Sequence, residues 1–276
     1  MHAFCYYNGK IVRTKNAGLP LNDVGILRGY GVFDFLRTYG RTPFLYREHY
    51  RRFVHSARIL DLTVPLGEKK VFAVIQTLLR KNKTTNCAVR MVLTGGVSPN
   101  GIDFKGANLF ILTEDLKTMP TELFERGGKL ILTEHSRQFR EAKTTNYLTH
   151  VRLQRTLKKE KAIEILYHFG GEVLECATSN VFLFKGDTLV TPKKGILIGM
   201  TRNYVLKLAR GRFKVVERAI LLSELFRAQE AFITATNKEI IPIVSIGGKR
   251  IGNGKVGART RILMELFRRE TLKVAH

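Results

Sequence analysis

Acidic residues are scarce in this sequence. It contains 23 Asp and Glu residues against 47 Lys and Arg residues, which gives a formal net charge of +24. Such a charge suits nucleic acid, an acidic membrane surface or anionic small molecules, and it does not choose among them. The basic residues are spread along the whole chain, and their densest pairs fall on helix-like segments, as they do on a solvated helix face. We therefore predict no nucleic-acid partner and keep a non-enzymatic nucleic-acid-binding protein only as a remote alternative.

Cysteines and long apolar runs are also few. The three cysteines, Cys5, Cys87 and Cys176, are odd in number and far apart, which argues against both a disulfide framework and a zinc site. No window holds the roughly 18 uninterrupted apolar residues of a membrane-spanning helix, and the N-terminus lacks a basic region followed by an apolar stretch. With 44% apolar and 25% charged residues, the sequence predicts a folded cytoplasmic protein with no membrane partner.

What the sequence does contain is an alternation of short strand-like and helix-like segments, which predicts an α+β fold. Asn8-Gly9 between two apolar runs is typical of a β-hairpin, and Phe53 and Ala57 belong to a helical spacing over residues 47–60, after a predicted strand at 44–46. Similar patterns predict further helices over 68–80, 146–159, 201–209, 223–229 and 258–270, and strands over 87–94, 107–113, 129–133, 163–168, 181–184, 188–191 and 231–234.

The apolar rhythm weakens around Met119-Pro120. Domain boundaries fall in such stretches, so we place an interdomain linker over residues 117–122. This divides the chain into a small α+β N-terminal domain, residues 1–116, and a larger C-terminal cofactor-binding domain, residues 123–276.

Two charged residues are candidates for chemistry on a cofactor aldehyde. Lys143 precedes a predicted helix and is flanked by small and polar residues that let a ring approach closely. Glu175 shares a strand-like segment with Glu172, and the two acids are expected to face differently. A carboxylate beside a pyridine nitrogen would keep that nitrogen protonated. Taken singly, the lysine is more often a solvated loop residue and the glutamate more often an ordinary edge-strand residue.

Two segments suit a phosphate group. Met200 and Thr201 open a predicted helix, and Thr236 and Asn237 follow a predicted strand. Helix capping and a turn explain each segment when it is taken alone. No Walker A sequence and no GxGxxG between a strand and a helix are present, so the sequence does not support nucleotide chemistry.

Taken in order, these pieces resemble the class IV (fold type IV) pyridoxal-phosphate enzymes, which include branched-chain aminotransferases, D-amino acid aminotransferases and aminodeoxychorismate lyases. The resemblance covers nearly the whole chain. It implies a two-domain fold with pyridoxal 5'-phosphate (PLP) between the domains, and a homodimer. Its landmarks are LRGYGVFD (27–34), EHYRRFVHSA (48–57), KTTNY (143–147), EVLECATSNVF (172–182), GMTR (199–202), ITATNKEIIPI (233–243) and IGNGKVG (251–257).

The resemblance also implies roles for individual residues. Lys143 is the Schiff-base lysine and proton shuttle, Glu175 the partner of the pyridine nitrogen, and Arg52 the guanidinium on the phosphate. The remaining cofactor contacts that it implies are Tyr147 at the phenolic oxygen, and Met200, Thr201, Thr236 and Asn237 at the phosphate. The substrates it implies are an amino acid and a 2-oxo acid such as 2-oxoglutarate.

The arginines of the sequence bear on the handedness of the substrate. D-amino acid enzymes of the family bind the substrate carboxylate with a Pro-Arg-x-His loop, but here Asn100 and Ile102 take those places. Arg28 occupies a position that is usually tyrosine, and Arg90 matches a substrate-side arginine of branched-chain enzymes. Two guanidiniums can form a carboxylate fork, so we predict a D-amino acid transaminase with an atypical arginine clamp.

Three alternatives stay open at this point. Arg28 can instead pair with Asp34, Asp23 or another acid and only shape the pocket. The enzyme can be an L-branched-chain aminotransferase, or a lyase of the aminodeoxychorismate type.

Overall fold

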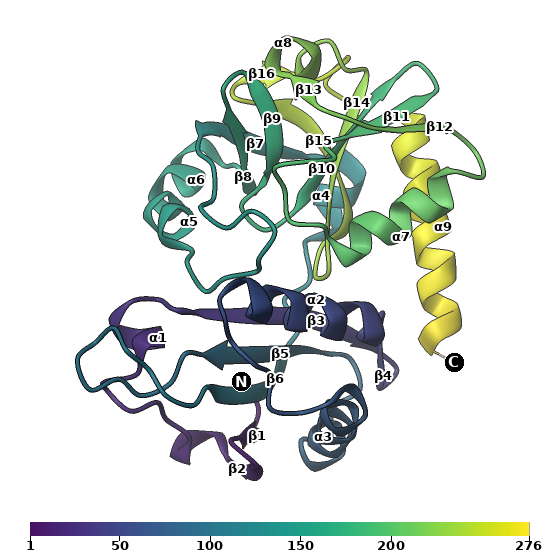
Figure 1. The fold of residues 1–276 in the computed structure, drawn as a ribbon. Helices are drawn as coiled ribbons and strands as arrows, with labels where there is room; N and C mark the ends of the chain where they lie inside the picture. The colour runs from purple at the N-terminus through teal and green to yellow at the C-terminus, as the bar shows by residue number, and fades with distance from the viewer. Residues whose placement is uncertain (276) are drawn as a thin grey trace. The chain divides into compact units, whose positions relative to one another are not determined.

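The computed structural model describes residues 1–275, which form two compact units (Figure 1). The first comprises Met1–Lys117, Ala142–Asn146 and the end of the last helix from Thr271 on. The second comprises Thr118–Glu141 and Tyr147–Glu270. Both combine helices with a β-sheet, which confirms the predicted α+β class. The segment that carries Lys143 belongs to the first unit, and the linker predicted at residues 117–122 stays a prediction.

The first unit is built on a six-stranded antiparallel sheet in the order β2-β1-β6-β5-β3-β4. Its predicted hairpin is confirmed, and Asn8 and Gly9 have φ angles of 41° and 93°, as a type I′ turn requires. The strands are β1 (Phe4–Tyr7), β2 (Lys10–Arg13), β3 (Gly31–Tyr39), β4 (Thr42–Pro43), β5 (Cys87–Thr94) and β6 (Asn108–Asp115).

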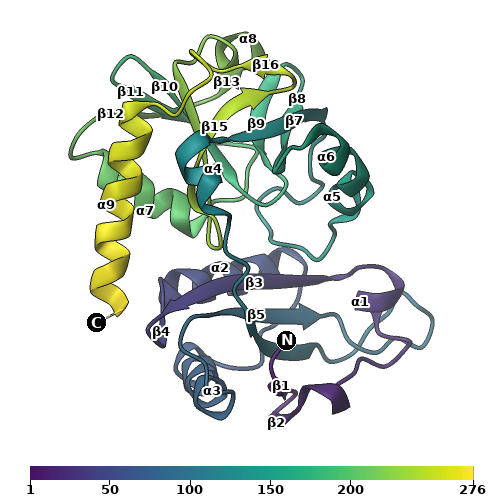
Figure 2. The same cartoon turned by 180° about the vertical axis from the view of Figure 1, so that it is seen from behind.

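Two long helices of the first unit share one core with this sheet. Phe53 of α2 and Ile75 of α3 are fully buried together with Leu36 of β3, and Figure 2 shows α2 lying along β3. The strand predicted at 44–46 is wrong, because Tyr46 already begins α2; a short apolar run suits either element. The helical elements are η1 (Thr14–Asn16, 3-10), α1 (Val24–Leu27), α2 (Tyr46–Ile59) and α3 (Glu68–Lys81).

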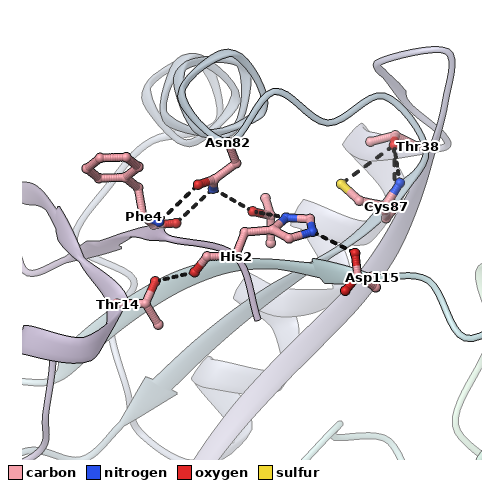
Figure 3. A network of polar contacts seen from close by, with 8 residues as sticks. His2, Phe4, Thr14, Thr38, Asn82, Cys87 and Asp115 are labelled. Carbon is pink, nitrogen blue, oxygen red and sulfur yellow. Dashed lines mark hydrogen bonds and ion pairs between the residues drawn. The ribbon is translucent and has the colours of Figure 1, made fainter.

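Side-chain hydrogen bonds fasten the start of the chain to this sheet (Figure 3). The Asn82 amide accepts from the backbone N–H of Phe4 and donates to its carbonyl, both at 2.9 Å. The His2 ring lies 3.0 Å from a carboxylate oxygen of Asp115, and the Thr14 hydroxyl donates to the His2 carbonyl at 2.7 Å. These bonds satisfy backbone groups at the first strand, where the chain enters the sheet.

The second unit is built on a ten-stranded mixed sheet in the order β12-β11-β10-β14-β15-β7-β8-β9-β13, with β16 paired to β15. The pairs β7–β8, β7–β15 and β11–β12 are parallel. The strands are β7 (Gly128–Glu134), β8 (Glu164–Phe169), β9 (Glu172–Cys176), β10 (Asn180–Lys185), β11 (Thr188–Thr191), β12 (Lys214–Glu217), β13 (Ile220–Leu221), β14 (Glu230–Ala235), β15 (Glu239–Ile246) and β16 (Lys249–Arg250).

The helices of the second unit depart from prediction at three places, of which the first is α4 (Thr121–Arg126), a helix that was not predicted. The single helix expected over 146–159 is two short helices that break at Leu153, where the sequence has no proline or glycine to signal it, and the helix expected over 223–229 is one turn. None of the helices described within residues 1–275 combines the length and apolarity needed to cross a bilayer. The helices are α4 (Thr121–Arg126), α5 (Leu148–Arg152), α6 (Gln154–Glu160), α7 (Met200–Ala209), α8 (Leu222–Leu225) and α9 (Ala258–Ala275).

Candidate functional site

Lys143 is fixed by its backbone to two elements of the first unit. Its N–H donates to the hydroxyl of Ser56 on α2 at 3.0 Å, and its carbonyl accepts from the N–H of Phe33 on β3 at 2.9 Å. The side-chain Nζ lies 4.5 Å from the centroid of the Phe33 ring. The lysine predicted to carry the chemistry is therefore not a freely solvated loop residue, because main-chain bonds and an aromatic ring define its place.

Arg52 lies one helical turn before Ser56 on α2, on the same side of that helix. Its Nε and one terminal nitrogen donate to the two oxygens of Asp34 at 2.8 and 2.9 Å. The Nδ1 atom of His49 lies 2.6 Å from the same carboxylate. Asp34 and His49 were not predicted as site residues, although Asp34 is the last residue of the landmark LRGYGVFD (27–34).

The charges of this group are set by burial and by one another. Burial raises the pKa of Asp34, but the Arg52 guanidinium and then His49 outweigh it and hold that pKa well below its usual range. Burial lowers the pKa of His49; Asp34 opposes this, and Arg52 and Lys143 add to the lowering. The result is an ionised carboxylate that fixes the direction of the Arg52 guanidinium beside a neutral imidazole.

Arg90 on β5 lies against the same ring as Lys143. Its Cζ is 5.6 Å from the Phe33 centroid and 5.0 Å from that of Phe35, distances at which a guanidinium is attracted to a ring face. One terminal nitrogen donates to a carboxylate oxygen of Glu114 at 2.6 Å. The structure therefore brings Arg90 and Lys143 to one aromatic side chain.

Arg28 lies at the end of α1, where its guanidinium donates to the carbonyl of Leu27 at 2.9 Å. The alternative in which Arg28 pairs with Asp34 or Asp23 is wrong, because both carboxylates bind other groups. Within residues 1–275 no carboxylate forms an ion pair with Arg28, and no contact joins it to Arg90. The groups that donate to Asp23 are the Gly25 N–H, the Thr94 hydroxyl and the Asn108 amide.

Glu175 lies in the second unit, buried on β9, whereas Glu172 on the same strand is exposed. This confirms that the two acids face differently. One oxygen of Glu175 accepts from the N–H of Leu197 at 2.9 Å and also from a terminal nitrogen of Arg137. Arg137 was missed in the sequence, because nothing in the pattern around it indicates a partner 38 residues away.

Tyr147 belongs to the same charged group. Burial lowers the pKa of Arg137, but Glu175 and then Tyr147 outweigh it and raise that pKa above its usual value. Tyr147 precedes α5, and its ring centroid lies 6.2 Å from that of His150. Glu175, the predicted ring-nitrogen partner, and Tyr147, the predicted phenolic-oxygen partner, therefore both raise the pKa of the same arginine.

The helix start predicted to bind phosphate is present in the second unit. Gly199 is the N-cap of α7 and makes no side-chain cap, and the first helical bond runs from the N–H of Asn203 to the Gly199 carbonyl at 3.0 Å. The N–H groups of Met200 and Thr201 therefore have no partner within the helix. An anion at this end would satisfy them.

The second predicted phosphate segment is the turn between β14 and β15, which carries Thr236 and Asn237. Thr234, two residues earlier, is buried, and its hydroxyl has no hydrogen-bond partner within the described part of the chain. Thr234 pairs in register with Asn180, whose side-chain oxygen packs so closely on Gly199 that a Cβ there would approach it to 2.1 Å. The end of β14 and the start of α7 therefore meet on one face of the second sheet.

Comparison with known proteins decides the family. The family described as amino-transferase class IV matches residues 31–246. The chain belongs to the class IV aminotransferases. This family uses PLP, so the chain is a PLP-dependent aminotransferase of fold type IV, and the alternative of a non-enzymatic protein is wrong.

Similarity to individual proteins extends over at least 95% of this aminotransferase. It is 34% identical over 273 residues to a Methanocaldococcus jannaschii protein assigned as a branched-chain-amino-acid aminotransferase, covering 95% of this chain and 94% of the other. It is 29% identical over 279 residues to a D-alanine aminotransferase of Listeria monocytogenes, with 96% and 95% covered. The solved branched-chain aminotransferase of the archaeon Thermoproteus uzoniensis, with norvaline, has a TM-score of 0.90, 25% identity and 99% and 96% coverage.

Features of the second unit suit the phosphate and the ring of this cofactor. The unpartnered Thr234 hydroxyl and the α7 start offer hydrogen-bond donors near one another. The Nε of Arg137 also has no hydrogen-bond partner within residues 1–275, and it lies beside the carboxylate predicted to meet the ring nitrogen. The unpartnered donors match an anionic ligand, and the Glu175 carboxylate beside Arg137 is the acceptor that a protonated ring nitrogen needs.

Proposed function

We propose that this aminotransferase acts on D-amino acids and that Arg28 and Arg90 bind the substrate carboxylate. The observation that carries the proposal is the sharing of the Phe33 ring by Arg90 and Lys143, which brings a guanidinium and the amine that would move the proton to the same side chain. Among the described residues no carboxylate pairs with Arg28, which leaves its charge available to a substrate anion. The similarity to D-alanine aminotransferases supports the proposed handedness.

The proposed cofactor residues divide the work of the reaction among them. Bound PLP supplies an electron sink for the charge that develops at the substrate α-carbon. Lys143 would hold the cofactor through its Nζ, and the same amine, when free, would accept the α-proton of the substrate. Glu175 keeps the ring nitrogen protonated. The remaining proposed contacts are Tyr147 to the phenolic oxygen, and Arg52, Met200, Thr201, Thr236 and Asn237 to the phosphate.

A 2-oxo acid such as 2-oxoglutarate then accepts the amino group by the same steps in reverse. We propose a homodimer as the working assembly.

A second candidate, an L-branched-chain aminotransferase, is favoured by the 34% identity to the Methanocaldococcus jannaschii protein. In that case Arg28 would be a structural residue, because a pocket for apolar side chains gains nothing from an unpaired guanidinium. An aminodeoxychorismate-type lyase is the third candidate and would release pyruvate without a 2-oxo acid acceptor.

Initial rates separate these candidates. The purified protein would be given PLP, 2-oxoglutarate and matched D- and L-forms of alanine, glutamate and leucine, with the product 2-oxo acid as readout. Preference for D-donors is expected. Preference for L-leucine would contradict the proposal and return the enzyme to the branched-chain group.

The clamp itself is tested by Arg28→Ala and Arg90→Ala. Each substitution removes a charge-assisted hydrogen bond to the substrate carboxylate, so we expect KM for the D-donor to rise about 10- to 100-fold. Arg58→Ala, at an exposed position on α2, is the control and should leave KM unchanged. Unchanged D-activity in Arg28→Ala would remove Arg28 from the clamp.

A further inference from the structure

Lys238 is a buried lysine in the turn between β14 and β15 that has no task in the steps above. Its side chain is only 8% exposed. Its ammonium donates to a carboxylate oxygen of Glu164 at 2.5 Å, to the Thr178 hydroxyl at 2.6 Å and to the Ser179 hydroxyl at 3.0 Å. An ammonium has three N–H donors, so these acceptors use all of them, and Lys238 is not itself placed to bind a further anion.

The partner of Lys238 is a fully enclosed carboxylate on β8. Glu164 also accepts from the Thr178 hydroxyl at 2.5 Å and from the Ser179 hydroxyl at 3.1 Å. Burial raises the pKa of Glu164, but Lys238 and then Thr178 outweigh burial and lower that pKa below its usual value. The two groups therefore form a charged ion pair: Lys238 and both hydroxyls donate to Oε2 of Glu164, and the Ile165 N–H donates to Oε1 at 3.3 Å.

General stability does not explain this arrangement. Replacing a buried ion pair by well-packed apolar residues is often neutral or stabilising, and ordering a lysine side chain costs rotamer entropy. A buried pair does, however, fix one geometry, because its hydrogen bonds are directional. The bonds of Lys238 reach β8 and the turn between β9 and β10, and so join three separate segments of the second unit.

The segment that this ion pair fixes is the turn that carries Thr236 and Asn237. One end is held by strand pairing of Ala235 with Glu239. The N–H of Lys238 donates to the Ala235 carbonyl at 3.2 Å, which closes the turn around the two residues. The buried side chain of Lys238 then holds the closed turn to Glu164, Thr178 and Ser179.

We propose that Lys238 is a positioning residue for phosphate recognition: the Lys238–Glu164 ion pair holds the turn in the conformation in which Thr236 and Asn237 bind the cofactor phosphate. This inference rests on the proposed function, in which Thr236 and Asn237 contact that phosphate. The ion pair is electrically neutral, so its contribution is orientation of the turn rather than positive charge.

The test compares two ligands that differ only in the phosphate, pyridoxamine 5'-phosphate and pyridoxamine. Neither needs covalent attachment to Lys143, so binding is measured by calorimetry independently of the chemistry. The double variant Lys238→Met/Glu164→Gln removes both charges together, because Lys238→Met alone would leave a buried carboxylate unpaired. Lys158→Met, at an exposed position on α6, is the matched control.

We expect the ratio of the two dissociation constants, pyridoxamine over pyridoxamine 5'-phosphate, to fall about tenfold in the double variant, with pyridoxamine affinity unchanged. Ser179→Ala keeps both charges and removes only one acceptor of the Lys238 ammonium. It replaces the double variant in this test if the double variant does not fold. In Ser179→Ala the ratio should fall about threefold.

An unchanged ratio in a folded double variant, or in Ser179→Ala if the double variant does not fold, overturns the inference. Equal weakening of both ligands overturns it as well, because the turn would then support the whole site rather than the phosphate. The proposed function fails separately: if the ratio falls as expected but the parent protein does not transaminate D-amino acids, the role of Lys238 stands and the proposed substrate does not.

Discussion

Each unit of the molecule contains a buried carboxylate bonded to an arginine, and the two pairs have opposite proposed tasks. In the first unit Asp34 is completely buried and binds Arg52 through both of its oxygens. In the second unit Glu175 accepts from Arg137 and from the main-chain N–H of Leu197. We propose that the first pair offers its arginine to the phosphate and that the second offers its carboxylate to the ring nitrogen. A buried ion pair therefore indicates that its charges are fixed in position, but it does not show which of its two residues contacts the ligand.

The largest effect is expected from Glu175→Gln. This variant keeps the shape of the side chain and removes the charge that would hold the ring nitrogen protonated, so kcat should fall by about 10²- to 10³-fold. Glu172→Gln on the same strand is exposed and is the matched control. Steady-state rates check this, and equal activity of the two variants would contradict the role of Glu175.

A smaller effect on binding is expected from Asp34→Asn. The asparagine amide is uncharged and has one acceptor oxygen, so it cannot replace the two charge-assisted hydrogen bonds from Arg52. The affinity for pyridoxamine 5'-phosphate should therefore fall about tenfold relative to the affinity for pyridoxamine. Breaking a buried ion pair should also lower the free energy of unfolding by about 3–5 kcal/mol. Calorimetry and denaturant unfolding measure the two quantities.

Asp115→Asn is the control for this variant, since the Asp115 carboxylate is exposed and pairs only with His2 in the described contacts. If Asp34→Asn lost stability but kept its preference for the phosphorylated ligand, Asp34 would be a core residue and not a support for Arg52.

The smallest effect is a pH dependence of stability that comes from Asp34. Its pKa is lower in the folded state than in the unfolded chain, so its contribution to stability is present above an unfolded pKa of about 3.9 and is lost as pH falls below it. Between about pH 5 and pH 3 the parent should therefore lose more unfolding free energy than Asp34→Asn. The free energy of unfolding would be measured by urea unfolding at each pH. If it changed with pH equally in the two proteins, Asp34 would not titrate in this way.

Local sequence patterns predicted much of the fold. The turn at Asn8-Gly9 and the apolar spacing around Phe53 both depend on neighbouring residues, and the structure confirms the elements that they predict. Strand β3 was missed because its buried face carries the polar residues Asp34 and Thr38 as well as Val32 and Leu36, which breaks the expected pattern of apolar residues.

The polar partners of the candidate site were not predictable in the same way. Arg137 and Glu175 are 38 residues apart, and Lys238 and Glu164 are 74 residues apart. Such pairs are brought together by strand order, which no local pattern records. The order of landmarks along the chain identified the family, but only the structure shows which side chains hold the predicted residues in place.

The most direct test of the account is to find which lysine binds the cofactor covalently. The purified protein would be incubated with PLP, reduced with borohydride, digested and analysed by mass spectrometry, with Lys143→Ala treated in parallel. We expect one stoichiometric phosphopyridoxyl label on Lys143 in the parent protein and no such label in Lys143→Ala. A stoichiometric label on another lysine, or none in the parent, would contradict it.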